Sequence, residues 1–118
     1  MGTVTDSSAR GATALPEPAV GEIRLEAVLH ALADPVRLRI VASLADSAEE
    51  VNCLAFDLPV AKSTLTHHFR VLREAGLIRQ CRRGTSRMNR LRTEELAERF
   101  PGLLDSVVAG YRTVAAAG

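Results

Sequence analysis

The chain has 118 residues, which is enough for one domain with a modest hydrophobic core. Its apolar fraction of 47% excludes a wholly disordered chain, and its aromatic fraction of 3% means that aliphatic side chains must supply the core. The net charge is only +1, but residues 62–92 hold nine Lys and Arg and a single acid, whereas residues 1–61 hold four Arg and nine acids. Such a basic segment is typical of a nucleic-acid-binding surface, with a solvated charged face as the plainer alternative.

The cysteines and the apolar runs indicate where the protein works. Two cysteines, Cys53 and Cys81, do not make a disulfide framework, and they suit a reducing cytoplasm. No apolar run approaches the length of about 20 residues that a membrane span needs, and the N-terminus lacks the apolar core of a signal peptide. We therefore expect a cytoplasmic protein that makes no membrane contact.

The N-terminal part of the chain predicts a tail followed by two helices. Residues 1–21 are a mixture rich in Gly, Ser, Thr, Ala and Pro, which predicts a flexible tail. Apolar residues then recur at helical spacing over residues 22–33. Asp34 and Pro35 favour the start of a second helix, because Asp is a good N-cap and Pro suits the first helical position. This second helix should run to about Ala45.

A helix-turn-helix and a hairpin are predicted in the middle of the chain. A short helix is expected over residues 48–57, and a proline-containing break ends it. The next helix, residues 61–75, has Gly76 as its left-handed C-cap. Two short extended runs around a glycine then predict a β-hairpin over residues 77–92.

The C-terminal residues predict two further helices. Thr93 should cap the first of them, whose opening turn carries two glutamates that favour the helix dipole. Pro101 and Gly102 interrupt it, and a last helix follows over residues 103–115. The apolar stripe of this last helix is wide for a small domain, so we expect it to be buried against a partner chain.

The helix at residues 61–75 has two contrasting faces. Leu65, Phe69 and Leu72 cluster on one side and should anchor it, while the opposite side is polar. Short hydrogen-bonding side chains with a cation suit base edges and phosphates in the major groove of double-stranded DNA, and the basic hairpin could follow the backbone beside it. The residues expected to contact DNA are Lys62, Ser63, Thr64, Thr66, His67, Arg70, Arg82, Arg83 and Arg87.

Two stretches of this sequence resemble the ArsR/SmtB family of regulators. ALADPVRLRI at residues 31–40 is similar to the opening of the family's second helix, and KSTLTHHFRVLREAGLI at residues 62–78 is similar to its recognition helix and first wing strand. The resemblance covers roughly residues 22–110. It implies a mainly α, winged helix-turn-helix fold of five to six helices over residues 22–115, and a homodimer formed through the first and last helices. It also implies binding to an imperfect inverted repeat in a promoter.

Many members of that family are released from DNA by a metal ion, but the usual metal-binding residues are missing here. Metal-sensing members have a Cys-x-Cys-Asp-Leu pattern where this chain has residues 50–54, and both of its ligand cysteines are missing here. Residues 94–118 contain no His. A non-standard site is a remaining candidate, in which His30 and a carboxylate, Glu22 or Glu26, of either chain bind nickel or zinc. The plainer interpretation of His30 is a surface or interface residue.

Two other functional classes are weighed against a DNA-binding regulator. A co-regulator or protein-interaction module would use its terminal helices to hold a partner protein, and its DNA binding would depend on that partner. An enzyme is disfavoured, because no nucleophile–base–acid set and no glycine-rich phosphate loop is evident. The sequence leaves open the effector, the operator sequence and whether the protein represses or activates.

Overall fold

The computed structural model describes residues 12–47, 49–56 and 58–117, which form five α-helices and a four-stranded antiparallel sheet. The elements, in chain order, are β1 (Ala12–Ala14), η2 (Val20–Glu22), α1 (Leu25–Leu32), α2 (Pro35–Ala45), β2 (Val51–Asn52), η3 (Cys53–Ala55), α3 (Lys62–Ala75), β3 (Ile78–Arg83), β4 (Ser86–Leu91), α4 (Thr93–Arg99) and α5 (Leu103–Ala117). The predicted mainly α chain with one β-hairpin is confirmed. None of the described helices is long and apolar enough to cross a membrane.

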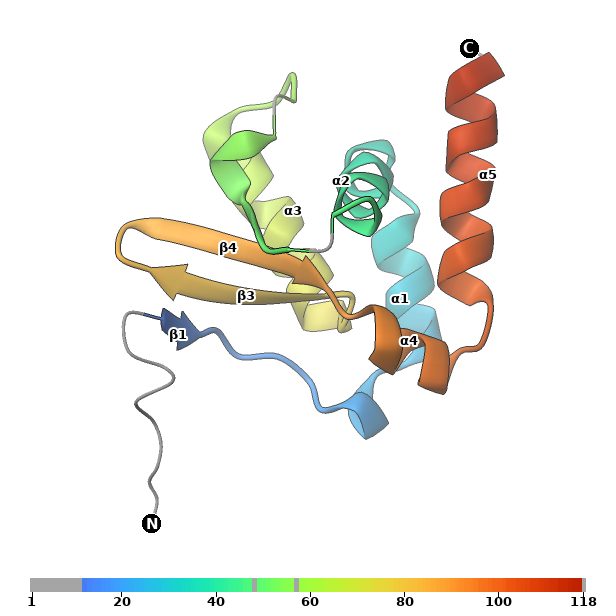
Figure 1. Ribbon diagram of the computed structural model, residues 1–118, viewed down its shortest axis with the longest axis horizontal. Helices are drawn as coiled ribbons and strands as arrows, with labels where there is room; N and C mark the ends of the chain where they lie inside the picture. The colour runs from blue at the N-terminus through green and yellow to red at the C-terminus, as the bar shows by residue number, and fades with distance from the viewer. Residues whose placement is uncertain (1–11, 48, 57, 118) are drawn as a thin grey trace.

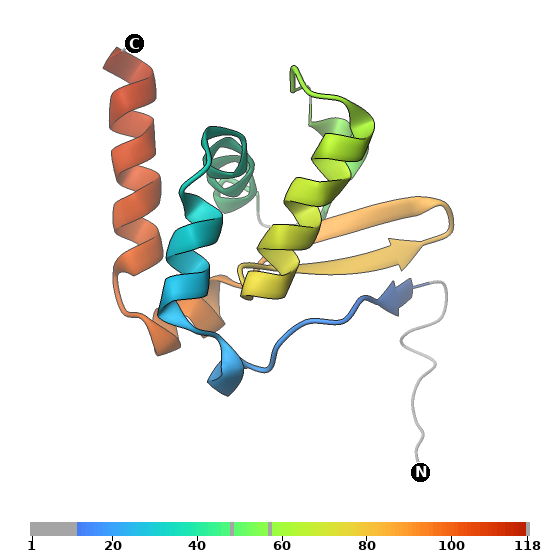
Figure 2. The ribbon, with the colours of Figure 1, turned by 180° about the vertical axis from the view of Figure 1, so that it is seen from behind.

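The helices and the hairpin occupy different parts of the molecule. Figure 1 shows α1, α2 and α5 gathered at one end, with the β3–β4 hairpin extending away from them. The view from behind in Figure 2 shows α3 between the hairpin and that helical end. We call the β3–β4 hairpin the wing, and α3 the recognition helix.

The start of α2 follows the prediction from sequence. The Asp34 carboxylate accepts hydrogen bonds from the backbone N–H groups of Val36, at 2.8 Å, and Arg37, at 3.1 Å. Pro35 occupies the first helical position, where its missing N–H leaves no hydrogen bond unmade. The helix ends at Ala45 as predicted.

The first predicted helix is shorter than the sequence pattern indicated. A helix was expected over residues 22–33, but α1 begins at Leu25, and Ile23 before it is extended, with φ −72° and ψ 123°. Ile23 is nevertheless buried, and its carbonyl accepts a hydrogen bond from Arg99 Nε at 2.8 Å. The periodicity therefore identified a core residue correctly and its backbone conformation wrongly.

The short helix predicted over residues 48–57 is wrong for the part of it that is described. Val51 and Asn52 form β2, which pairs with β4, and only Cys53–Ala55 make a 3₁₀ turn. Residues 48 and 57 lie outside the described residues. The pairing partners of β2 are more than 30 residues away in sequence, so local periodicity carried no sign of this strand.

The recognition helix has an unusual start and a tightly closed end. Its N-cap, Ala61, has no side chain that can accept a hydrogen bond from the first turn. At the other end Gly76 has φ +93°, and its N–H and that of Leu77 close the last turn. A Cβ on Gly76 would lie 2.6 Å from Ile23 Cγ1, so this position requires glycine for both backbone and packing reasons.

The predicted hairpin is confirmed and lies in a sheet of order β1-β3-β4-β2. Its register runs from Ile78 opposite Leu91 to Arg83 opposite Ser86, with Gly84 at the tip at φ +61°. Cross-strand partners lie on one face of a sheet. The pairs Ile78–Leu91 and Gln80–Asn89 therefore share one face of the hairpin, and all four of these residues are buried.

Part of the segment predicted as a tail lies along the wing. We call residues 12–18 the strap; β1 within it pairs antiparallel with β3, and Leu15 N donates to the Gln80 carbonyl at 3.0 Å. Of the tail predicted over residues 1–21, residues 1–11 lie outside the described residues. The boundary between tail and domain stays a prediction.

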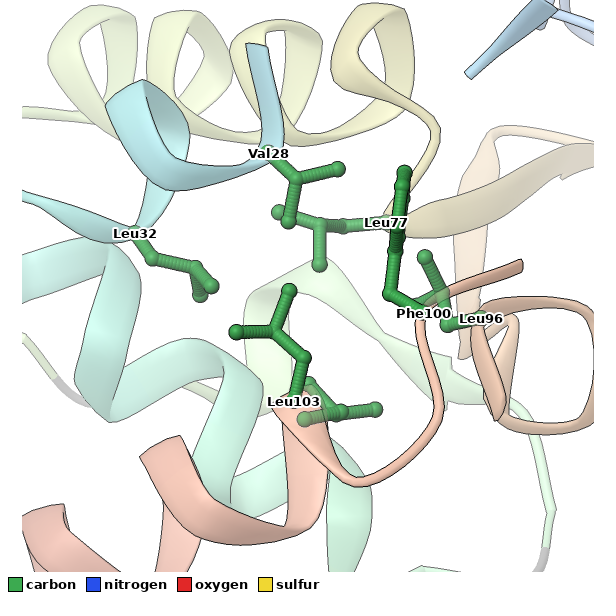
Figure 3. Close-up of a pocket in the computed structure, with 7 residues that line it drawn as sticks. Val28, Leu32, Leu77, Leu96, Phe100 and Leu103 are labelled. Atoms are coloured by element: carbon green, nitrogen blue, oxygen red, sulfur yellow. The ribbon is translucent and has the colours of Figure 1, made fainter. Parts of the chain in front are cut away.

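The C-terminal helices complete the core. Helix α4 begins one residue earlier than predicted, with Arg92 rather than Thr93 as its N-cap, and α5 extends to Ala117. Figure 3 shows side chains of α1, α4 and α5 and of the segment between them meeting around Leu77. They leave no space for a water molecule. This junction is therefore packed core rather than a ligand site. Its lining residues are Val28, Leu32, Leu77, Leu96, Phe100, Leu103 and Leu104.

Candidate nucleic-acid interface

The outer face of the recognition helix is polar and open to solvent. All of its predicted contact residues are exposed, whereas Phe69 and Leu72 on the inner face are 1% and 0% exposed. The amphipathic pattern of the sequence therefore gave the orientation of this helix correctly. The exposed residues are Lys62, Ser63, Thr64, Thr66, His67 and Arg70.

Hydrogen bonds on this outer face fix which atoms remain available. Thr66 Oγ1 donates to the Lys62 carbonyl at 3.0 Å, so the hydroxyl oxygen is left as an acceptor. Arg70 Nη2 lies 3.2 Å from His67 Nδ1. A guanidinium can only donate, so this ring nitrogen must accept, and the neutral ring carries its proton on Nε2. Donors and acceptors thus stand side by side on the face.

Behind this face a buried Arg–His contact joins α2 to α3. Arg37 Nη1 donates to His68 Nδ1 at 3.0 Å, and Arg37 Nε donates to the Ala31 carbonyl at 2.6 Å. Burial lowers the pKa of His68; Asp34 opposes this effect, and Arg37 and His67 make smaller contributions to the lowering. His68 is therefore neutral with its proton on Nε2, and its role is to join the two helices.

The burial of Arg37 does not follow from the helical periodicity of the sequence, because Arg37 lies off the apolar stripe of α2. Its side chain is 8% exposed and both of its described hydrogen bonds are to the interior. A signal was available, because Arg37 lies one turn after the N-cap Asp34. Its cation therefore lies near that carboxylate, whose pKa burial tends to raise but hydrogen bonds and nearby cations hold below its usual value.

The wing presents one pair of arginines on the side of the recognition helix. Arg82 lies opposite Arg87, and the next pair inward on the same face is Gln80 with Asn89. Gln80 receives a hydrogen bond from the recognition helix, so this face is turned toward α3. Arg82 and Arg87 make no ion pair with any acid among the described residues. Their charges are therefore available to a ligand.

Arg83, the third predicted wing residue, points to the opposite face. Its Nη2 lies 2.9 Å from Glu50 Oε1, and this ion pair raises the pKa of Arg83. Cys81 lies on the same face, where burial and Glu50 raise its pKa, against the effect of Arg83. A protonated thiol is a poor nucleophile, so the raised pKa makes Cys81 less reactive than an ordinary cysteine.

A groove of about 250 Å³ separates the recognition helix from the wing. Cations stand on both of its sides, with Lys62 on α3 and Arg87 on β4, and Cys53 Sγ donates to the Arg87 carbonyl at 3.4 Å. Hydroxyls between two cations suit the phosphates of a nucleic-acid backbone. The lining residues are Asn52, Cys53, Lys62, Leu65, Thr66, Phe69, Thr85, Ser86 and Arg87.

The metal-binding candidates are not assembled within one chain. Glu22 accepts a hydrogen bond from Ala19 N at 2.9 Å, and Glu26 pairs with Arg24 at 3.3 Å. His30 is exposed on α1. Within the described ranges no group of three or more His, Cys, Asp or Glu could hold a metal ion. These residues therefore do not fit a metal site in a single chain, and a site shared between two chains stays a prediction.

A recognition helix with an exposed polar face, followed by a basic β-wing, is the arrangement of the winged helix-turn-helix class of DNA-binding transcriptional regulators. Residues 34–80 match a family model described as "Bacterial regulatory protein, arsR family". A Bacillus subtilis (strain 168) protein, named "Uncharacterized HTH-type transcriptional regulator YceK", is 30% identical over 82 residues, which cover 68% of this chain and 82% of the relative. The chain belongs to the arsR family, which is non-enzymatic, and the family predicted from the sequence is confirmed.

Proposed function

We propose that this regulator binds an inverted-repeat operator as a homodimer, with one recognition helix in the major groove of each half-site. The observation that carries the proposal is the polar face of α3, which is exposed over its length while the opposite face is anchored in the core. Ser63, Thr66, His67 and Arg70 are the side chains proposed to reach base edges. Lys62, Thr64 and the wing pair Arg82 and Arg87 are proposed to contact phosphates. Arg83 would join them only when released from Glu50.

The terminal helices support a dimer. Leu25 and Leu29 on α1 are 44% and 46% exposed, and Val114 on α5 is 72% exposed, which is unusual for large apolar side chains that gather in one region. A groove of about 410 Å³ lies between these helices, with Leu29 on one side and Val107 and Tyr111 on the other. A second copy of the chain, related by twofold symmetry, would cover these residues and set two recognition helices one helical turn of DNA apart.

Selection of binding sites from a random-sequence duplex pool tests the proposal, followed by anisotropy titrations of the selected duplex. We expect a short inverted repeat, two chains per duplex by sedimentation, and an affinity that falls steeply as salt rises. A specific contact to a base should cost about 1–3 kcal/mol when removed. We therefore expect His67→Ala and Arg70→Ala to weaken binding to the selected duplex more than to a random one.

Selection of single half-sites by a monomer would contradict the dimer. A loss of equal size on both duplexes would contradict base contact by α3. Weak binding to every duplex, restored by a second protein, would instead favour the co-regulator alternative.

A further inference from the structure

A buried chain of polar side chains crosses the base of the wing. Arg73 Nη1 on the recognition helix donates to Gln80 Oε1 on β3 at 2.6 Å, and Gln80 Nε2 donates to Asn89 Oδ1 on β4 at 2.8 Å. Asn89 Nδ2 then donates to the Val51 carbonyl on β2 at 3.0 Å. Gln80 is 1% exposed and Asn89 is 0% exposed. One hydrogen-bonded chain therefore joins the recognition helix to three strands in succession.

The direction of this chain is fixed at its helix end. A guanidinium only donates, so Gln80 must turn its oxygen toward Arg73 and its amide nitrogen toward Asn89. Asn89 in turn must accept with its oxygen, which leaves its nitrogen to donate to Val51. Neither amide can rotate by half a turn without placing two acceptors or two donors against each other. Because these groups are buried, such a mismatch would leave polar atoms unsatisfied, and the arrangement therefore has a single favourable register.

The strap holds the same helix residue from outside. Arg73 Nε donates to the Pro16 carbonyl at 3.0 Å, while Leu15 N donates to the Gln80 carbonyl at 3.0 Å. The Arg73 guanidinium is thus held between the strap and the wing. Residues 15 and 16 thereby become part of the joint between the recognition helix and the wing.

We infer that Gln80 and Asn89 are positioning residues for DNA binding, which set the wing relative to the recognition helix. This inference rests on the proposed contact of the wing with DNA. Arg82 and Arg87 are the next pair on the same face, two residues nearer the tip, or about 7 Å along the strands. Because Arg73 holds Gln80 and Asn89 in place, it also sets the position of Arg82 and Arg87 relative to the recognition helix. This position decides where the two arginines contact a duplex that is bound to the recognition helix.

A double-mutant cycle on the full chain tests this role. The probe is a random-sequence duplex at low salt, because phosphate contacts do not need an operator. In the wild-type background we expect Arg82→Ala/Arg87→Ala to weaken binding about tenfold, and in the Asn89→Leu background less than about twofold, since a displaced wing has little contact left to lose. The matched control is Lys62→Ala, which should cost the same factor in both backgrounds.

The outcomes separate this inference from the proposed function. If the arginine pair costs the same factor with and without Asn89→Leu, the positioning role is wrong. If the pair costs nothing in the wild-type protein, the proposed contact of the wing is wrong, and the inference is overturned with it. Circular dichroism establishes that each variant is folded. Should Asn89→Leu fail to fold, Arg73→Met takes its place in the cycle, because it breaks the chain at a partly exposed residue.

Discussion

Phe69 and Leu72 hold the recognition helix to the core through apolar contact, whereas Gln80 and Asn89 hold the wing through hydrogen bonds. Apolar burial is non-directional, so the helix can keep its place with a different set of apolar side chains. Hydrogen bonds require particular atoms in particular orientations. Apolar burial therefore stabilises the position of the recognition helix, whereas hydrogen bonds define the orientation of the wing relative to that helix.

The largest effect is expected on the apolar side of the comparison. Phe69 is 1% exposed, and its ring lies edge-on to Phe56 with 5.4 Å between the ring centroids. Phe69→Ala should lower the free energy of unfolding by about 3–5 kcal/mol, because it removes a buried aromatic ring and leaves a cavity in its place. Urea denaturation followed by circular dichroism measures this, with the exposed Thr64→Ala on the same helix as control. A loss below about 1 kcal/mol would show that the helix is not seated by this ring.

Substitutions of Gln80 and Asn89 should lower the free energy of unfolding less, and their effects should not be additive. Asn89→Leu removes the hydrogen bonds that the Asn89 side chain makes with the Val51 carbonyl and with Gln80 Nε2, which should lower the free energy of unfolding by about 1–3 kcal/mol. Gln80→Leu should cost a similar amount by itself. The double variant should be less destabilised than the sum of the two, since each single change strands the other residue. Strict additivity in denaturation experiments would contradict a shared chain.

A smaller effect should depend on pH. The pKa of His68 lies below its ordinary value of 6.5, so the unfolded chain takes up a proton at a higher pH than the folded chain. Stability from the neutral ring is complete above pH 6.5 and declines as the pH falls below it, by at most about 1.4 kcal/mol per pH unit. Denaturation at several pH values measures the slope. In His68→Gln, whose amide oxygen can still accept from Arg37, the slope should be reduced. An unchanged slope would show that groups other than His68 cause the pH dependence. Asp34 is not such a group in this pH range, because its pKa lies below 3.8.

The smallest effect should come from the far face of the wing. Glu50→Gln removes the acid that pairs with Arg83 and leaves that cation free to meet phosphate. Exposed ion pairs contribute about 0–1 kcal/mol, so we expect affinity for duplex DNA at low salt to rise by no more than about fivefold. Anisotropy titration measures it. Glu98→Gln on α4 makes the same change of charge away from the wing, and an equal rise in that variant would reduce the effect to net charge.

Features that depend on local sequence could be predicted, whereas features that depend on contacts between distant elements could not. The recognition helix, its exposed face and its C-cap at Gly76 followed from periodicity and cap chemistry, which are local. The second helix followed from Asp34 and Pro35 in the same way. Where a strand depends on a distant partner, as β2 does on β4, local pattern predicted a helix instead. Hydrogen bonds between elements, such as that of Arg37 with His68, were equally out of reach.

The candidate interface was predicted in composition but not in arrangement. The exposed residues of α3 are those expected, since exposure follows from helical spacing. The three wing arginines looked equivalent in the sequence, yet strand alternation places Arg82 and Arg87 on one face and Arg83 on the other. Alternation in this hairpin was hard to see, because its inward positions include Gln80 and Asn89 rather than apolar residues. Because the buried pair Gln80 and Asn89 is polar, the sequence did not show which residues of the hairpin face inward.

Gly76 shows how a mutational map of this protein could mislead. A side chain there would meet both an unfavourable positive φ and the Ile23 side chain at 2.6 Å, and either one is a penalty by itself. Every substitution at this position should therefore abolish DNA binding, although residue 76 is buried within the turn from helix to wing and cannot contact DNA. In such a map Gly76 would look as important for DNA binding as any residue on the outer face of α3. Measuring the amount of folded protein and its affinity for DNA separately would distinguish a residue needed for folding, such as Gly76, from one that contacts DNA.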